Sequence, residues 1–571
     1  MPSPIETTSA VFTSLLGVET VDSLVYSHKW SVDDLQDTYD LSYSFINKSS
    51  VFDSFNYDSE SDSNLLWGSL GEFNLVQKNA LRDVISEWSY VSGISFVEVE
   101  ESDTTVGDIR LGLSSEVVTV VGDATGFAYL PGNYYPSSGD IWFNSNANDI
   151  FGGFVVSTFE NSDFKPGSLA YYTALHEFGH ALGLKHPFES LPESSSVLSP
   201  DLDEISNTVM SYTYVAGDNS VLGLNIYPST PMSYDISAIQ HLYGKNVAHR
   251  GEDTTYNFGD GEFYFETISD PSGEDTIVYD GSFSLNMDLT PGSSSFVGKE
   301  VQTYGNNSSD SEYAIPNIWI SNNTEIENVI GSRANDVIKG NHLNNEISGG
   351  LGNDFIFGED GNDVLKGGLG SDTVEGGDGF DVYKLTDSYE NYFLKQVSEG
   401  TWLVDGDAGE GDDLITGIER INFGDVTFGD SLQQVVALDI GPGDTAGQAY
   451  RLYQAAFSRI PDGQGVSYHV NDLEVNGLSL YQVAQNFLAS PEFLDKYGLN
   501  LSDFDYIDAL YQNVLRRSGS EEEVNFYIKN FEKEKTESGY MDRGMALIGF
   551  SESPENISLV ASQMDGGILF F

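Results

Sequence analysis

A nine-residue repeat constrains this chain more than any other feature of its sequence. From Gly331 the chain reads GSRANDVIK, GNHLNNEIS, GGLGNDFIF, GEDGNDVLK, GGLGSDTVE and GGDGFDVYK. Every unit opens with Gly, and Asp takes the sixth place in all but the second unit, which has Asn345. The eighth place is always apolar or aromatic, which a flexible linker would not need. A fixed short period of this kind predicts a stack of repeated turns and short strands.

The repeat pattern predicts a parallel β-roll that binds calcium. The first six residues of each unit form a turn whose carbonyls and Asp carboxylate face one ion, while the eighth side chain packs inward. Calcium suits such turns because it takes six to eight oxygen ligands in flexible geometry. In the first two units, Ser332 and Ala334 replace Gly, which ligation through carbonyls tolerates, and Asn345 replaces Asp, which removes a charge, so sites there are expected to be weaker. The predicted ligands in the repeats are Ser332, Ala334, Asp336, Asn341, Leu343, Asn345, Gly350, Gly352, Asp354, Glu359, Gly361, Asp363, Gly368, Gly370, Asp372, Gly377, Gly379 and Asp381.

The charge balance agrees with a preference for cations. The 571 residues include 25 Lys and Arg against 89 Asp and Glu, which gives a net charge of −64. Such a chain repels nucleic acid and anionic membranes. Without Cys it has no disulfides, thiolate zinc sites or Cys nucleophiles. Its N-terminal residues show neither the basic region nor the apolar run of a usual secretory signal, and no apolar run long enough for a transmembrane helix is found.

The segment HEFGHALGLKHP, which starts at His176, predicts a catalytic zinc site. His176 and His180 are four residues apart, so a helix places both imidazoles on one face. Gly183 can end that helix with a positive φ, which lets His186 supply a third nitrogen. Three imidazoles leave a coordination position for water, and Glu177 is placed to act as general base. The other histidines are interpreted as surface or core residues: His28, His241, His249, His342 and His469.

The chain is expected to contain three folded parts of different classes. Strand-like runs such as 108–113 and 140–144 mix with helix-like runs at 74–91, 168–183 and 233–244, which indicates an α+β domain. The repeats follow as an all-β roll. In the last segment LYQAAFSR recurs as LYQNVLRR, and FLASPEF is echoed by FSESPEN, which predicts a two-fold helical module. The predicted boundaries are 1–17 for a short propeptide, 18–247 for the catalytic domain, 248–439 for the calcium-binding domain and 440–571 for the helical module.

With SNTVMSYTY downstream of the histidine motif, the chain resembles the serralysin branch of the metzincin zinc peptidases. Pro187 after the third His is part of this resemblance, as are LSYSF, GDIRLGL, GFAYLPG, GDIWFN and TPMSYDISAIQHLYGKN, in the expected order over roughly residues 15–425. The resemblance implies that Met210 forms the methionine turn beneath the zinc and that Tyr212 is an additional zinc ligand that stabilises the transition state. It also implies that the GFAYLPG strand is a sheet edge that holds an extended peptide substrate, which would make the enzyme a broad endopeptidase.

The resemblance adds calcium positions ahead of the repeats, namely Arg250, Glu252, Thr254, Asp270, Ser272, Gly273, Asp275 and Glu327. Glu252 and Ser272 stand where the family usually has Gly. Calcium-roll proteins commonly leave Gram-negative bacteria by type I export, so the resemblance implies a secreted, extracellular protein whose partners are protein substrates and that export machinery. The last segment resembles a tandem helical domain of unknown function, for which contact with a cell surface or glycan is a hypothesis. We expect a monomer.

Two other functions compete with a zinc- and calcium-dependent endopeptidase. The first is a non-catalytic calcium-roll surface or adhesion protein with a degenerate peptidase domain. Degeneration is disfavoured because the site residues are intact, namely His176, Glu177, His180, His186, Met210 and Tyr212. The second is a zinc hydrolase that acts on a non-peptide substrate, which the methionine turn disfavours.

Overall fold

The computed structural model describes residues 10–31, 39–50, 66–121, 124–132, 137–145, 150–151, 154–155, 164–192, 194–216, 218, 221–305, 314–406, 410–424, 434–498 and 500–570. The chain forms two compact units, Met1–Asn328 and Val329–Phe571. Part of the segment expected to be a propeptide, residues 1–9, lies outside the described residues. The domain boundaries inferred from the sequence stay predictions.

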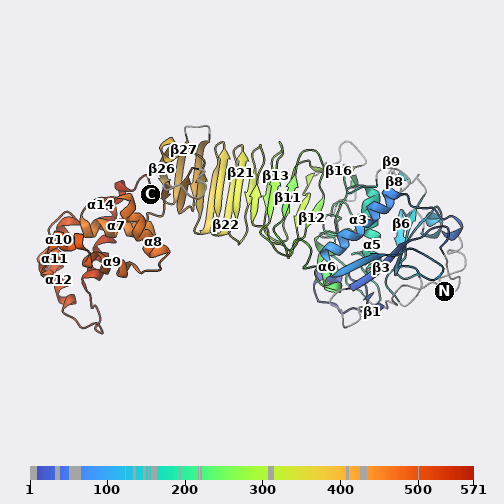
Figure 1. Cartoon of the computed structure of the whole chain (residues 1–571), viewed down its shortest axis with the longest axis horizontal. Coiled ribbons are helices and arrows are strands. Elements are labelled where there is room, and N and C mark those ends of the chain that lie inside the picture. The colour runs from blue at the N-terminus through green and yellow to red at the C-terminus, as the bar shows by residue number, and fades with distance from the viewer. Residues whose placement is uncertain are drawn as a thin grey trace. The chain divides into compact units, whose positions relative to one another are not determined.

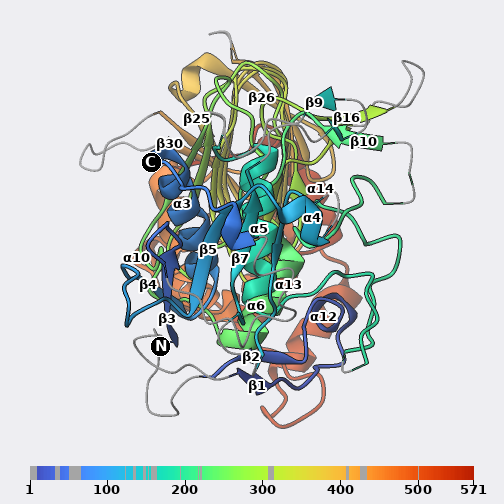
Figure 2. The same cartoon turned by 90° about the vertical axis from the view of Figure 1, so that its right-hand side faces the viewer.

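A five-stranded sheet and two long helices form the N-terminal part of the first unit (Figure 2). The strand order is β4-β3-β5-β7-β6, and only β6 runs antiparallel to its neighbour. The strands are β3 (Tyr39–Phe45), β4 (Ile94–Glu98), β5 (Ile109–Ser114), β6 (Gly126–Ala128) and β7 (Ile141–Asn144). The helices are α3 (Leu75–Val91) and α5 (Leu169–Ala181), which lie in contact and share a core that includes the fully buried Trp88 and Phe178. A capping box between Asn74 and Gln77 begins α3.

Smaller elements complete the first unit. Around the sheet lie β1 (Ala10–Phe12), α1 (Glu19–Asp22), β2 (His28–Trp30), α4 (Val117–Val121), β8 (Ile150–Phe151), β9 (Phe154–Val155), β10 (Val221–Leu224) and α6 (Ser233–Tyr243). They are followed by β11 (Thr255–Phe258), β12 (Glu266–Ile268), β13 (Thr276–Tyr279), β14 (Asn286–Asp288), β15 (Ser294–Ser295), β16 (Val301–Gly305), β17 (Ala314–Ile315) and β18 (Ile318–Ile320). β11 pairs with β13, and β12 with β18, in parallel.

The nine-residue repeats form the roll predicted from the sequence, visible as the yellow arrows around the labels β21 and β22 in Figure 1. Its strands are β19 (Asn328–Ile330), β20 (Val337–Lys339), β21 (Glu346–Leu351), β22 (Phe355–Gly361), β23 (Val364–Leu369), β24 (Thr373–Gly379) and β25 (Val382–Leu385). Alternate units pair in parallel, so that Ile338, Ile356 and Val374 stand in one row, and Ile347, Leu365 and Tyr383 in another. All six side chains are buried, as expected for the eighth place.

Five strands, eight α-helices and then a sixth strand follow the repeats among the described residues of the second unit. The strands are β26 (Tyr392–Ser398), β27 (Thr401–Gly406), β28 (Gly411–Thr416), β29 (Arg420–Phe423) and β30 (Gln434–Ala437). The helices are α7 (Thr445–Phe457), α8 (Gly463–Glu474), α9 (Leu480–Ala489), α10 (Pro491–Tyr497), α11 (Asp503–Asn513), α12 (Glu521–Phe531), α13 (Arg543–Ser551) and α14 (Pro554–Val560). The duplicated sequences fall on α7 and α11, and on the α9–α10 and α13–α14 junctions. The last strand, β31 (Ile568–Phe570), pairs with β30.

The predicted succession of fold classes is therefore confirmed: a mixed α and β part, a β-rich part with the repeats, and a helical part. A search of the described helices for one with the length and hydropathy of a membrane span found none.

Candidate metal centre

Helix α5 places His176 and His180 on one face, one turn apart. The helix begins at Ser168, whose hydroxyl accepts a hydrogen bond from the amide of Tyr171 at 3.2 Å. It lies within the core, since nearly all of its side chains are buried. This rigid, buried helix fixes the positions of the two imidazoles before any ligand binds.

The turn after α5 brings His186 back to the same place. Gly183 has a φ of +104°, and a Cβ there would lie 2.8 Å from the carbonyl oxygen of His28, so only glycine fits this turn. Pro187 is buried, and its carbonyl accepts a hydrogen bond from the amide of Leu198 at 2.8 Å. The chain is thus held on both sides of His186.

The three histidines meet at their Nε2 atoms. Nε2 of His186 lies 3.2 Å from Nε2 of His176 and 3.1 Å from Nε2 of His180. A tetrahedral ion with bonds of about 2.05 Å has nitrogens about 3.3 Å apart, so the spacing fits one zinc ion. These three residues are also a group whose ligand atoms all lie within 4.8 Å of one another.

Backbone carbonyls orient two of the rings. Nδ1 of His176 lies 2.7 Å from the carbonyl oxygen of Val209, and Nδ1 of His180 lies 2.8 Å from that of Leu184. An N–H on Nδ1 that donates to these carbonyls leaves the lone pair on Nε2, which faces the centre. Burial lowers the pKa of His176 to about 3 and that of His180 well below its usual range, with further lowering from the neighbouring histidines. Neutral imidazoles are the form that binds metal.

Glu189 lies beside the third ring, with Oε1 2.9 Å from Nδ1 of His186. The carboxylate is close to this outer ring nitrogen, although the two groups are not aligned as a hydrogen bond. Glu189 was not among the predicted site residues, because no motif marks the loop that follows His186.

The carboxyl group of Glu177 lies buried next to the histidines. Its Oε2 has no hydrogen-bond partner among the described residues. Burial raises its pKa to about 8. Its Cγ lies 3.2 Å from where a Cβ would stand on Gly126, the first residue of the edge strand β6. A buried carboxyl without a partner is costly unless it is kept for a ligand, so this group is suited to handle a proton at the centre.

The turn that contains Met210 lies beneath the site. Met210 is fully buried, and its Sδ lies 2.5 Å from where a Cβ would stand on Gly179 of α5. Asp235 of α6 holds the turn, since its carboxylate accepts hydrogen bonds from the Thr208 hydroxyl at 2.6 Å and the Val209 amide at 2.7 Å. The role of Asp235 was not predicted, because Thr208 and Val209 lie more than 25 residues away from it in the sequence.

Tyr212 extends from the same turn to the histidines. Its hydroxyl lies 2.6 Å from Nε2 of His186, and its ring stacks 5.4 Å from that of His176. Burial, followed by the charges of Glu177 and Glu189, raises its pKa above the usual range, so the phenol stays protonated at neutral pH. The structure therefore brings all the predicted zinc-site residues together.

The calcium positions predicted ahead of the repeats form one cluster. Asp275 accepts a hydrogen bond from the Thr254 amide at 2.8 Å, and the Asp275 amide donates to Glu327 at 2.7 Å. Gly273 has a φ of +145°, and a Cβ there would lie 2.8 Å from the carbonyl oxygen of Glu252. Oδ2 of Asp275 is buried without a partner among the described residues. The Ser272 amide lies 3.4 Å from Asp270, and Arg250 has a φ of 50° and donates to Tyr256, which in turn donates to Asp270.

Within the repeats, the carboxylates form two rows. In each row the amide of one sixth-place residue donates to the sixth-place carboxylate eighteen residues later, as Asp336 does to Asp354 at 2.8 Å. The second oxygens of Asp354, Asp363, Asp372 and Asp381 are buried and lack partners in the described part of the chain. Burial raises the pKa of Asp354 to about 7 and that of Asp363 to about 6. Oxygens of this kind fit a bound divalent cation.

Backbone carbonyls face the same rows. A Cβ on Gly352 would lie 2.5 Å from the carbonyl oxygen of Ala334, and the same close approach recurs at Gly350, Gly361, Gly368, Gly370, Gly377 and Gly379, which face Ser332, Leu343, Gly350, Gly352, Glu359 and Gly361. The first two units differ from the rest. Asp336 accepts from the Ser332 amide at 2.6 Å and Asn345 from the Asn341 amide at 2.9 Å, whereas the corresponding oxygens of the later units have no partner among the described residues.

Comparisons with known proteins agree with these sites. Residues 74–244 match the matrixin family, residues 322–356 and 348–383 match the RTX calcium-binding nonapeptide repeat, and residues 484–560 match a domain of unknown function. A serralysin of Photorhabdus laumondii is 30% identical over 334 residues, which cover 54% of this chain and 60% of that protein. A serralysin of Proteus mirabilis is 30% identical over 305 residues (48% and 56%), and the metalloprotease AprA of Pseudomonas entomophila is 32% identical over 298 residues (49% and 56%).

The similarity thus spans 56% to 60% of the length of these three relatives. The matched families imply a zinc ion for the first unit and calcium for the repeats, and the donor sets described above fit both metals. The chain contains a metzincin peptidase domain of the serralysin type, followed by RTX calcium-binding repeats.

Proposed function

We propose that this protein is a secreted, zinc-dependent endopeptidase whose folded β-roll is stabilised by calcium. The observation that carries the proposal is the convergence of three Nε2 atoms in the site that holds the buried Glu177, whose Oε2 has no hydrogen-bond partner among the described residues. A zinc ion supplies a Lewis acid that polarises a carbonyl oxygen and acidifies a water molecule. The chain's own residues supply the rest of the chemistry.

Glu177 is the general base in this proposal. Its free Oε2 accepts the proton of the attacking water and passes it to the leaving amine nitrogen. The burial that raises its pKa makes it a stronger base than an exposed carboxylate. Tyr212 remains protonated and donates its hydroxyl proton in a hydrogen bond to the oxyanion that develops on the substrate.

Strand β6 is the proposed substrate-binding edge. Among the described strands it ends the sheet and pairs only with β7, so its other side can bind an extended peptide through backbone hydrogen bonds. Gly126 at its start lies against Glu177, which places the bound backbone next to the base. Backbone recognition favours unfolded or flexible protein substrates with little side-chain selection.

We infer the extracellular location and type I export from the repeats. Buried carboxylate rows repel one another without cations, so the roll is expected to fold only where calcium is plentiful, as it is outside the cell. The serralysin resemblance points to the same route.

Cleavage of casein by the full chain, refolded with zinc and calcium, tests the activity. The variant Glu177→Gln should keep one bound zinc and lose roughly 10²- to 10⁴-fold in kcat. The matched control Glu116→Gln changes a carboxyl outside the site. An inactive wild type with zinc bound would favour the adhesion protein, and an active Glu177→Gln would remove the role of Glu177.

A further inference from the structure

The roll continues after the last repeat that the sequence pattern reveals. The repeats end at Lys384, and the matched RTX segment ends at residue 383. After an intervening stretch that includes β26 and β27, residues 408–416 read AGEGDDLIT. This segment fits the nine-residue pattern, with Asp413 at the sixth place and the fully buried Ile415 at the eighth. Residues 408 and 409 lie outside the described residues.

The strand that follows this turn joins the roll in the register of a repeat. β28 pairs in parallel with β24, and Val374 stands opposite Ile415. The pairing matches that of β22 with β24, in which Ile356 stands opposite Val374. The eighth-place row therefore passes from Val374 to Ile415 across the insertion.

The carboxylate row continues in the same way. The Asp354 amide donates to Oδ1 of Asp372 at 2.8 Å, and the Asp372 amide donates to Oδ1 of Asp413 at 3.0 Å. One place further along each unit, the Thr373 amide donates to the Asp354 carbonyl at 2.8 Å, and the Leu414 amide donates to the Asp372 carbonyl at 2.8 Å. Asp413 therefore has the same relation to Asp372 that Asp372 has to Asp354.

Two other hydrogen-bond rows reach the same turn. At the fifth place the Ser371 amide donates to Asn353 at 2.9 Å, and the Asp412 amide donates to the Ser371 hydroxyl at 3.1 Å. The Gly370 amide donates to the Glu410 carbonyl at 3.0 Å. The Gly370 carbonyl oxygen lies 2.0 Å from where a Cβ would stand on Gly411, which has a φ of +84°. This close approach matches that of the Gly352 carbonyl to Gly370 in the unit before.

The carboxylate row that contains Asp363 and Asp381 ends at Glu419. The hydrogen bonds between Asp381 and Glu419 match those between Asp275 and Glu327. The Asp381 amide donates to Oε2 of Glu419 at 2.7 Å, while the amides of Glu419 and Arg420 both donate to the Asp381 carbonyl at 3.1 Å. The Asp275 amide donates to Oε2 of Glu327 at 2.7 Å. The Glu327 amide donates back to the Asp275 carbonyl at 3.3 Å. The proposed calcium pair Asp275–Glu327 is thus reproduced at Asp381–Glu419.

We propose that these two turns complete two additional calcium sites, one between Asp372 and Asp413 and one between Asp381 and Glu419. Asp372 and Asp381 are 1% and 0% exposed, and the Oδ2 of each has no hydrogen-bond partner among the described residues. Calcium accepts carboxylate and carbonyl oxygens of the kind gathered here. Tyr383 supports the first site, because its hydroxyl donates to Oδ2 of Asp413 at 2.8 Å and fixes that side chain.

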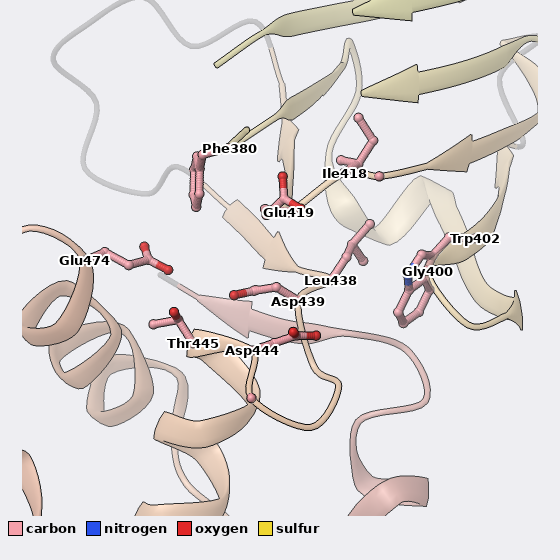
Figure 3. Close-up of a pocket in the computed structure, with 12 residues that line it drawn as sticks. Phe380, Gly400, Trp402, Ile418, Glu419, Leu438, Asp439, Asp444, Thr445 and Glu474 are labelled. Atoms are coloured by element: carbon pink, nitrogen blue, oxygen red, sulfur yellow. The ribbon is translucent and has the colours of Figure 1, made fainter. Parts of the chain in front are cut away.

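The second site adjoins the contact between the roll and the helical part. Arg420, next to Glu419, forms ion pairs with Asp439 and with Glu474 of α8. Figure 3 shows Glu419, Asp439 and Glu474 around a cavity of about 400 Å³. The proposed cation at Glu419 therefore lies one residue away from the ion pairs that join β29 to the helical part.

Calcium titration of the full chain tests both sites. Asp413→Asn and Glu419→Gln keep the hydrogen-bond acceptors but remove the charge. Each should lose one bound calcium or bind one calcium at least tenfold more weakly. The control Asp412→Asn removes an equal charge from an exposed side chain in the same turn and should bind calcium as the wild type does. Titrations of Asp413→Asn and Glu419→Gln that superimpose on that of Asp412→Asn would overturn the proposal.

A second measurement does not depend on the variants folding. Crystals of the unaltered chain grown with terbium in place of calcium should show anomalous density beside Asp372 and Asp413, and beside Asp381 and Glu419. Density confined to the earlier turns would overturn both sites, and density at one pair alone would remove the site at the other.

Discussion

The carboxylate of Asp235 accepts a hydrogen bond from the amide of Val209 at 2.7 Å, and the carbonyl of Val209 lies 2.7 Å from Nδ1 of His176. Helix α6 thereby orients a metal-binding ring through one residue of the methionine turn.

Asp235→Asn should weaken zinc binding by about 10- to 100-fold. A side-chain amide has one acceptor oxygen, so it cannot accept hydrogen bonds from both the Thr208 hydroxyl and the Val209 amide on separate oxygens, and the turn beneath His176 should shift. Zinc affinity can be measured by competition with a chelator at constant pH. Asp201→Asn, at an exposed position in the same loop region, is the control. Equal zinc affinity in the two variants would contradict the positioning role of Asp235.

Gly179→Ala should destabilise the first unit by about 1–3 kcal/mol, because the new Cβ would lie 2.5 Å from the buried Sδ of Met210. Gly68→Ala is the matched control, since nothing lies within 4 Å of its added Cβ. Thermal unfolding followed by calorimetry should show a lower Tm for Gly179→Ala alone. A Tm equal to that of the control would contradict the prediction, because it would mean that Met210 shifts to make room for the added Cβ without loss of stability.

Lys185→Met should also lower the Tm, by an amount that corresponds to about 1–3 kcal/mol, because it leaves buried carbonyls without donors. The buried Lys185 ammonium donates to the carbonyls of Ser23, Glu189 and Ser196 at 2.6, 2.7 and 2.8 Å. Lys245→Met, at an exposed position, should leave the Tm unchanged. The loop that carries Glu189 should become more sensitive to proteolysis only in Lys185→Met.

Without calcium, the roll should be more stable in mild acid than at neutral or higher pH. Burial raises the folded-state pKa of Asp354 to about 7 and that of Asp363 to about 6. A raised folded-state pKa gives stability below the unfolded-state value that is lost as the pH rises through the folded-state value. Circular dichroism of the chelated chain should therefore show more strand signal at about pH 5 than at about pH 8.

With calcium present, the roll should be more stable at neutral pH than in mild acid, because protons compete with the cation for the same carboxylates. The calcium concentration at the folding midpoint should rise as the pH falls. A midpoint that is independent of pH would show that these carboxylates do not bind the ion.

Local patterns in the sequence predicted the elements and most of the site. The expected helices at 168–183 and 233–244 are α5 (Leu169–Ala181) and α6 (Ser233–Tyr243), because apolar periodicity and capping residues act over a few positions. The histidine spacing likewise depends on one helix and one glycine turn. Asp235 and Lys185 could not be predicted, since their roles depend on contacts with backbone groups that only the folded chain brings near. Glu189 could not be predicted because no motif marks the loop in which it lies.

The closing turns of the roll escaped prediction for another reason. Asp413 follows its predecessor Asp372 by 41 residues, whereas Asp354 and Asp372 are 18 apart. The hydrogen bonds tolerate this insertion because its hairpin, β26 and β27, extends the sheet beyond β28 and does not lie between β24 and β28. A constant repeat period in the sequence is broken by it.

The separation of eighteen residues within each row has a consequence for how such a roll can lengthen or shorten. Loss of a single nonapeptide would move every later turn to the opposite side of the roll. Asp413 would then end the row that Glu419 ends now, and Glu419 would end the row of Asp413. Loss of two consecutive nonapeptides would leave Asp413 and Glu419 each at the end of its present row. Rolls of this kind should therefore gain or lose nonapeptides two at a time. A change by an odd number of nonapeptides is expected only where the carboxylates that end the two rows have also been replaced.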